Sequence, residues 1–395
     1  MFAYNKTRLE QTFLLEEAQN LNQGGFINTD QYRLIENQLT GLKTQKSFLI
    51  RIGLFLVGLI LCGSICGVLS LSTFSIHSAT AISLLAFVFS GLCFAILEWM
   101  IAVKKYYGYG LDDAFLFSGQ IAFAWGLFVV LDGLELREIW LIWCVIMGCA
   151  AITAFCAIRY LNVLSTLGAC VSLTFGVGYW LVETKVSITP LLMMLFAVLI
   201  AVSFNYLKKS LKTVYYLKPI QTVIYYSYIL FYLSGNIWVI SHFSYYFSDA
   251  ENTAPGLSQL FLSYFYWTFT FIIPLIYIFR SIKTRDKGWL WIGIAALFYS
   301  FYNLIGLTAF LSTDWWLTLS GALLFSGCLW AIAKIRHRQS GLTFEVDRLR
   351  DDPSFIDAEA LLVTAQLGMK PEVNQEAPMK FGGGGFSGGG AGGSY

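Results

Sequence analysis

Charged side chains are scarce in this sequence. Asp, Glu, Lys and Arg together make up 13% of the 395 residues, whereas hydrophobic residues make up 57%. Soluble domains typically carry ~25% charged residues. A water-soluble fold of this composition would have too little polar surface to cover its apolar interior. The composition therefore excludes an ordinary soluble protein and favours one that is solvated by lipid.

The common catalytic motifs are absent as well. The sequence contains no P-loop, no His-Glu-x-x-His, no Gly-x-Ser-x-Gly and no paired carboxylates inside an apolar segment. ATP hydrolysis by this chain is therefore not expected. The sequence singles out no catalytic residue, no metal site, no cofactor and no nucleic-acid partner.

Cysteines are present only inside apolar segments, so no disulfide framework is expected in the loops. Cys62 and Cys66 lie four residues apart on one helix face, but no His or carboxylate accompanies them. This pair is more typical of small apolar packing residues than of a metal site.

The N-terminus lacks the basic and then apolar stretch of a secretory signal. It reads MFAYNKTRLEQTFLLEEAQ, which predicts no cleavable signal peptide. The first apolar segment is then expected to act as an uncleaved signal anchor. No eukaryotic targeting motif is visible, which favours a bacterial inner membrane.

Long apolar runs are what the sequence has in abundance. A helix needs ~20 apolar residues to cross a hydrocarbon core ~30 Å thick, and runs that are continuously apolar favour helices over a barrel. They predict an all-α fold, a polytopic α-helical membrane protein with about ten transmembrane helices within residues 48–335. The expected spans are 48–70, 79–101, 114–131, 139–158, 160–180, 188–207, 220–240, 258–279, 289–310 and 316–335.

Basic residues are concentrated in alternate loops. Clusters such as Lys208-Lys209 occupy one set of loops, whereas the other set contains only Arg137 and Lys185. Cytoplasmic loops carry the excess of Lys and Arg in membrane proteins. The pattern predicts that both termini are cytoplasmic.

Residues 1–47 are predicted to form a small helical hairpin. LEQTFLLEEAQNL is amphipathic, Gly24-Gly25 ends it, and Asn28 or Thr29 is the expected N-cap of a second helix. The segment GGFINTDQYRLIENQL, placed ahead of many spans, resembles the N-terminal domain of unknown function of a broad bacterial family of uncharacterised multi-span membrane proteins. The resemblance covers about forty residues of this chain and implies architecture only.

The C-terminal region is predicted to have two parts. Residues 336–380 read as a cytoplasmic segment with one short helix, and FGGGGFSGGGAGGSY, residues 381–395, is too rich in glycine to order alone. This tail resembles the Gly-rich C-termini of TPM-domain membrane proteins. Its aromatic residues, Phe381, Phe386 and Tyr395, are candidate partner-binding positions because a bare backbone with sparse aromatics can enter a narrow groove. The alternative is a solvated spacer.

A first candidate polar site lies where the second and third spans meet. Glu98 is an acidic residue within a span, and such residues tend to mark function or a structural pair. The loop that follows is short, so Lys105, Asp112, Asp113 and Gln120 are expected close to it. These residues form either an ion or substrate site, or an interfacial cluster that fixes the hairpin, with Asp112 as a helix cap.

A second candidate is a cavity in spans seven to nine. Tyrosines recur there at helical spacing, and span eight contains a proline that can bend it. The alternative is interhelical hydrogen bonding alone. The residues concerned are Tyr228, Tyr232, Thr270, Pro274, Tyr299, Tyr302 and Asn303.

These features leave three functional hypotheses. The first is a non-catalytic assembly or scaffold component of the inner membrane, whose partners are the lipid bilayer and membrane or cytoplasmic proteins bound through the tail. The second is a transporter or small-molecule sensor that uses the tyrosine-lined region. The third is a membrane enzyme that acts on a lipid-linked substrate through Glu98, Asp112 and Asp113.

Overall fold

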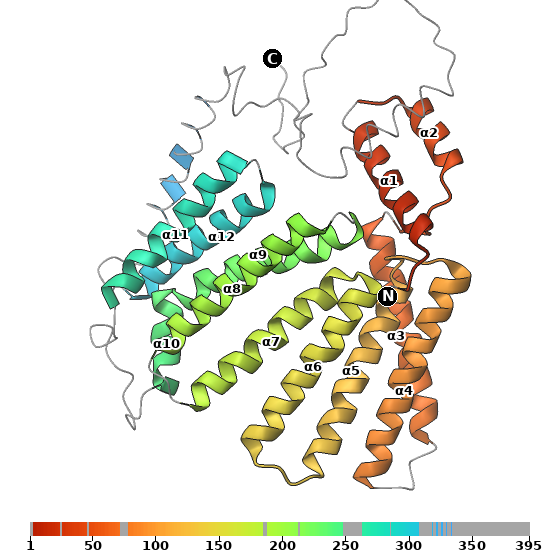
Figure 1. The fold of residues 1–395 in the computed structure, drawn as a ribbon, viewed down its shortest axis with the longest axis horizontal. Coiled ribbons are helices and arrows are strands. Elements are labelled where there is room, and N and C mark those ends of the chain that lie inside the picture. Colours follow the sequence, from red (N-terminus) through yellow and green to blue (C-terminus); the bar gives the residue numbers. More distant parts are fainter. Residues whose placement is uncertain are drawn as a thin grey trace, which may run out of the picture. The chain divides into compact units, whose positions relative to one another are not determined.

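A computed structural model of the chain describes residues 3–23, 26–45, 47–71, 78–184, 188–211, 214–247, 263–284 and 286–307, with isolated positions beyond them. The chain divides into two compact units, Met1–Thr12 with Thr40–Ser300 and Phe13–Leu39 with Phe301–Tyr395. Figure 1 labels the helices in chain order. They are α1 (Lys6–Gln23), α2 (Thr29–Gln38), α3 (Phe48–Leu71), α4 (Ala79–Trp99) with a π-helical turn (Met100–Lys104), α5 (Leu111–Asp132), α6 (Glu138–Tyr160), α7 (Val163–Glu183), α8 (Thr189–Ser210), a 3-10 turn (Val214–Tyr216), α9 (Leu217–Ser234), α10 (Ile237–Phe247), α11 (Ser263–Thr284) and α12 (Lys287–Leu307).

Seven of the described helices are long and apolar enough to cross a bilayer. They are α3, α4 with its π-helical turn, α5, α6, α7, α8 and α11. This confirms an all-helical architecture and indicates an integral membrane protein with several passes. Helices α9 and α12 overlap two more of the expected spans, and most of the expected span 316–335 lies outside the described residues.

The seventh expected span, 220–240, is wrong in its extent. Helix α9 ends at Ser234 and α10 begins at Ile237. Oδ1 of Asn236 accepts hydrogen bonds from the backbone N–H of Trp238 at 3.0 Å and of Val239 at 3.4 Å. Asn236 therefore caps a new helix inside an apolar run, which hydropathy does not detect.

Helices that follow one another in the larger unit pack as hairpins. Helix α4 packs on α5, α6 on α7 and α8 on α9, while α5 also contacts α3 and α6. The Ser90 hydroxyl donates to the Gly119 carbonyl oxygen at 2.8 Å, which joins α4 to α5. A Cβ on Gly126 would lie 3.2 Å from the Ala86 Cβ. Small residues thus allow the close approach that membrane helices use for van der Waals packing.

The smaller unit contains the turn between α1 and α2. Ala18, Ile27 and Ile35 are buried together there. The Gln31 side chain accepts a hydrogen bond from the backbone N–H of Asn28 at 2.8 Å, which satisfies a donor at the start of α2. Both helices form in the segments where the sequence predicts them.

Candidate functional site

The first polar cluster is centred on Asp113, in the first turn of α5. Its Oδ2 accepts hydrogen bonds from Nε of Arg51 at 3.1 Å and from Nη2 at 2.6 Å. Its Oδ1 accepts from Nδ2 of Asn162 at 2.8 Å. Asn162 also caps α7, since its Oδ1 accepts from the Ser165 backbone N–H at 3.0 Å. One carboxylate therefore connects the starts of α3, α5 and α7.

Asp112 faces the loop that precedes α5. Its Oδ1 accepts hydrogen bonds from the backbone N–H of Tyr109 at 2.9 Å and of Gly110 at 2.8 Å. The side chain is buried, and the positive end of the α5 dipole favours its charge. Asp112 therefore organises the loop and the start of the helix.

Glu98 is bound to α6 instead. Its Oε1 accepts from Nε of Arg159 at 2.6 Å and from the hydroxyl of Tyr160 at 2.9 Å. The two charged side chains are about one-third exposed. This ion pair connects the last turns of α4 and α6.

The remaining members of the expected cluster also have separate contacts. Nε2 of Gln120 donates to the Ser165 hydroxyl at 2.8 Å, in a buried contact between α5 and α7. Lys105 ends the π-helical turn with a φ of 61°, and its carbonyl accepts from the Lys43 backbone N–H at 2.8 Å. Four of the five predicted residues thus lie at one end of the helices, Gln120 lies near the middle of α5, and they take part in separate contacts.

Sequence reasoning missed the residues that complete these contacts, above all Arg51, Arg159 and Asn162. Arg51 and Asn162 lie 62 and 49 residues from Asp113, so no local pattern connects them. For the two arginines a signal was present, because a charged side chain in a span needs a partner. In the described part of the chain, no group of three or more His, Cys, Asp and Glu side chains could hold a metal ion.

Ala3 and Tyr4 lie against the helix ends that carry this cluster. The Ala3 backbone N–H donates to the Arg159 carbonyl at 3.0 Å, and the ring of Tyr4 packs edge-on against Tyr107 at 5.1 Å. Burial raises the pKa of the Tyr4 phenol well above its ordinary value, and the negative charge of Asp112 raises it further. Tyr4 therefore stays neutral and acts as an apolar cover with a polar tip.

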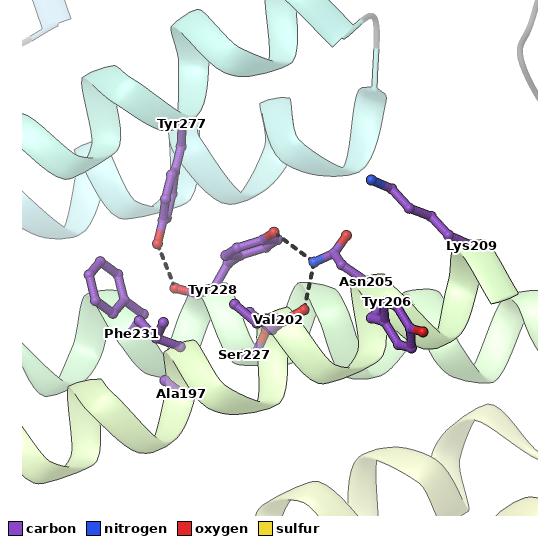
Figure 2. A pocket seen from close by; sticks show the side chains of 11 residues that line it. Ala197, Val202, Asn205, Tyr206, Lys209, Ser227, Tyr228, Phe231 and Tyr277 are labelled. Carbon is purple, nitrogen blue, oxygen red and sulfur yellow. Dashed lines mark hydrogen bonds between the residues drawn. The ribbon is translucent and has the colours of Figure 1, made fainter.

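The second candidate site is a cavity of about 460 Å³ between α8, α9 and α11. Figure 2 shows the side chains around it. It is lined by Ala197, Val198, Ala201, Val202, Asn205, Tyr206, Lys209, Ser227, Tyr228, Phe231 and Tyr277. Ligand sites are usually apolar clefts of ~300–1,000 Å³ with few polar groups, and this cavity fits that description.

Asn205 and Lys209 lie toward one end of the cavity, as Figure 2 shows. Nδ2 of Asn205 donates to the Ala201 carbonyl at 2.7 Å and to the Tyr228 hydroxyl at 3.2 Å (Figure 2). The Tyr277 hydroxyl donates to the Tyr228 carbonyl at 2.9 Å and holds α11 against α9. Lys209 lies one helical turn beyond Asn205.

Three bonding groups in this cavity remain available for a ligand. Within the described residues, no hydrogen bond engages Oδ1 of Asn205 or the ammonium group of Lys209. The Tyr228 hydroxyl accepts from Asn205 and still has its own proton to donate. An acceptor, a neutral donor and a cation therefore lie at one end of an apolar cavity.

The residues predicted to line a cavity in spans seven to nine do not all line it. Tyr228 lines the cavity. Pro274 is fully buried within α11, Tyr302 is exposed and Asn303 is buried. Tyr299 packs its ring against Tyr232 at 6.4 Å.

Tyr232 and Thr270 belong to an interhelical hydrogen-bond network. The Tyr232 hydroxyl donates to the Ala296 carbonyl at 2.9 Å and accepts from Nδ2 of Asn236 at 3.0 Å. The Ser300 hydroxyl donates to the Thr270 carbonyl at 2.7 Å. These bonds position α9, α11 and α12 and leave Tyr228 as the predicted residue that faces the cavity.

Helix α8 supplies most of the cavity wall, and sequence reasoning treated it as an ordinary span. Ala197, Ala201, Asn205 and Lys209 recur every four residues, so they share one helix face. The signal that could have indicated the cavity is that this face of α8 changes from small to polar residues along the helix. The tail residues Phe381, Phe386 and Tyr395 lie outside the described residues.

Comparison with known proteins gives this chain no relative. No protein-family model matches it, and no curated protein or solved structure shows significant similarity to it.

Proposed function

We propose that this multi-pass membrane protein binds an amphipathic organic anion in the cavity between α8, α9 and α11, as a transporter or a small-molecule sensor. The observation that carries the proposal is that the Tyr228 hydroxyl and the Lys209 ammonium line an apolar cavity, while Asn205 donates to the Tyr228 oxygen and so leaves the Tyr228 proton for a ligand. A carboxylate or phosphate head can accept from the Tyr228 hydroxyl and the Lys209 ammonium. An attached apolar chain would lie against Ala197 and Phe231.

The location of the head group follows from the charge pattern. Lys208 and Lys209 are in the last turn of α8, at the end of the helix where the sequence places basic residues. We place this end at the cytoplasmic side of a bacterial inner membrane, with both termini cytoplasmic. The ligand would then enter from the cytoplasm or from the inner leaflet.

Removing the Tyr228 hydroxyl is expected to weaken binding of dodecanoate about twofold to tenfold. One hydrogen bond contributes ~0.5–1.5 kcal/mol, and ~1.4 kcal/mol is tenfold in affinity. Lys209→Gln is expected to weaken it by up to about fivefold, less at high salt, because Lys209 is exposed and exposed charges are screened. Calorimetric titration of the protein in nanodiscs, with empty nanodiscs as the blank, measures both effects.

Two neighbouring residues provide matched controls. Tyr226 is on α9 but donates to the Thr174 hydroxyl at 2.9 Å, and Lys208 precedes Lys209 without lining the cavity. Tyr226→Phe and Lys208→Gln should leave dodecanoate affinity unchanged. Equal losses in test and control variants, or equal affinity for dodecanol and dodecanoate, would exclude this cavity as an anion site.

A second role, as a non-catalytic assembly component, is supported by the composition of the C-terminal tail. Residues 381–395 combine glycine with Phe381, Phe386 and Tyr395. Such a segment can add as a strand to a sheet edge or enter a narrow groove of a partner protein.

Truncation after Lys380 is expected to remove at least one protein that co-purifies with the full-length chain from native membranes. Mass spectrometry of both preparations measures this. A full-length variant with Phe381, Phe386 and Tyr395 replaced by Ser keeps the glycine content and should lose the same protein. An unchanged set of co-purifying proteins would make the tail a spacer.

A further inference from the structure

A second apolar depression lies on other helices, away from the cavity described above. It has a volume of about 470 Å³ and is formed by α4, α5 and α6. We name it the α4–α6 groove. Its lining residues are Phe87, Ser90, Gly91, Phe94, Ala95, Glu98, Phe123, Ile152, Phe155 and Tyr160.

Small residues of α4, among them Gly91 and Ala95, line the groove. Around Gly91, no atom lies within 4 Å of the position that a Cβ would occupy. Aromatic rings, including Phe94 and Phe155, also line it. The groove therefore presents an open apolar surface along α4, with room for an aliphatic chain beside Gly91.

The length of the groove matches one leaflet of a bilayer. Phe87 and Glu98 mark its extent on α4 and are eleven residues apart. At 1.5 Å per residue they are about 16 Å apart along the axis, close to half of a hydrocarbon core of ~30 Å. An acyl chain that follows the groove would run from the interface to the bilayer centre.

Glu98 lines the polar end of the groove, and its ion-pair partner Arg159 lies beside that end. Oε1 of Glu98 accepts both bonds from Arg159 and Tyr160, and within the described residues no hydrogen bond engages Oε2. The ion pair uses Nε of Arg159. The terminal amino groups of that guanidinium do not take part in it and can bind a phosphate.

We infer that the α4–α6 groove binds one phospholipid whose head group carries a phosphate and a primary ammonium, as in phosphatidylethanolamine. The phosphate would accept from the terminal amino groups of Arg159, and the ammonium would donate to Oε2 of Glu98. A choline head has no N–H to donate, and a glycerol head has no positive charge to face Glu98. A neutral ion pair and a zwitterionic head therefore complement each other in charge.

The site is tested by photo-crosslinking of the full-length protein in phosphatidylcholine nanodiscs. The probe is phosphatidylethanolamine with a diazirine on one acyl chain, and mass spectrometry maps the labelled peptides. Labels are expected on α4 and α6 at the groove. Gly91→Phe should reduce them at least tenfold, because the ring would occupy the open space beside Gly91.

Gly63→Phe is the matched control. Gly63 on α3 also has open space around it but does not line the groove, so its variant should keep full labelling. Thermal unfolding of both variants would verify that they fold. Uniform labelling over all lipid-facing helices, or labelling that survives Gly91→Phe, would overturn the proposal.

Competition tests the head group. In the wild-type protein, unlabelled phosphatidylethanolamine should displace the probe at least fivefold more effectively than phosphatidylcholine or phosphatidylglycerol. Glu98→Gln should remove that preference, since the amide carries no charge to attract an ammonium. Equal displacement by all three lipids in the wild type would refute the proposed head group. The outcome is independent of the cavity between α8, α9 and α11, which shares no residue with this groove.

Discussion

Asp113→Ala is expected to lower the free energy of unfolding by about 3 kcal/mol, the lower end of the ~3–5 kcal/mol for breaking a buried ion pair. The lower end applies because the Arg51 side chain is 41% exposed, whereas that of Asp113 is 10% exposed. The substitution removes the acceptor of three hydrogen bonds and leaves Arg51 and Asn162 without it. Unfolding in mixed micelles, followed by the reactivity of the helix cysteines toward a thiol dye, measures the loss.

Two further variants show how much of that loss comes from the charge of Asp113 and whether it is specific to this position. Asp113→Asn keeps an acceptor but loses the charge, so about half of the destabilisation should remain if hydrogen bonding contributes ~1.5–3 kcal/mol for charged partners. Asp132→Ala, at the exposed end of the same helix, should change stability by less than ~0.5 kcal/mol. A loss as small for Asp113→Ala as for Asp132→Ala would mean that the Asp113 cluster does not join the helices.

Gly110→Ala is expected to destabilise the protein by about 3 kcal/mol or more. Gly110 has a φ of 107°, a conformation that costs an L-residue ~1–3 kcal/mol. A Cβ there would also collide with the Arg51 carbonyl oxygen, and overpacking adds ~1–3 kcal/mol. The same mixed-micelle unfolding experiment measures the loss.

Gly67→Ala is the control for this prediction. Gly67 lies in α3, and no atom lies within 4 Å of the position that its Cβ would occupy, so alanine should be neutral or stabilise the helix by up to ~1 kcal/mol. If both variants behave alike, the tight loop before α5 does not require glycine. A loss confined to Gly110→Ala would show that the contact between this loop and α3 is rigid.

Part of the fold could be predicted from local patterns. Continuous apolar runs placed α3 to α8, and the turn signals around Asn28 placed the start of α2. The predicted span 220–240 was wrong because the helix break inside it depends on one side chain, Asn236. This side chain caps α10 and donates a hydrogen bond to the Tyr232 hydroxyl. Hydropathy averages over such a residue and does not detect it.

The sequence predicted which acidic residues lie near this end of the helices, but not which side chains they bind. The sequence placed Glu98 and Asp113 near the same end of neighbouring helices, because a short loop joins those helices. It could not identify Arg159 and Arg51 as their partners, which are 61 and 62 residues away. Pairing over such distances depends on how α3 and α6 pack on the hairpin of α4 and α5.

The sequence by itself determined that this protein is helical and membrane-embedded, because every backbone polar group in lipid must be satisfied within its own helix. That requirement acts on each apolar run separately, so composition and length were sufficient. Only the tertiary structure decided which polar groups are already satisfied and which remain available. The Asp113 carboxylate accepts hydrogen bonds from Arg51 and Asn162, whereas Asn205 and Lys209 line a cavity. Local sequence does not reveal this difference, because side chains on different helices pair only when the helices pack.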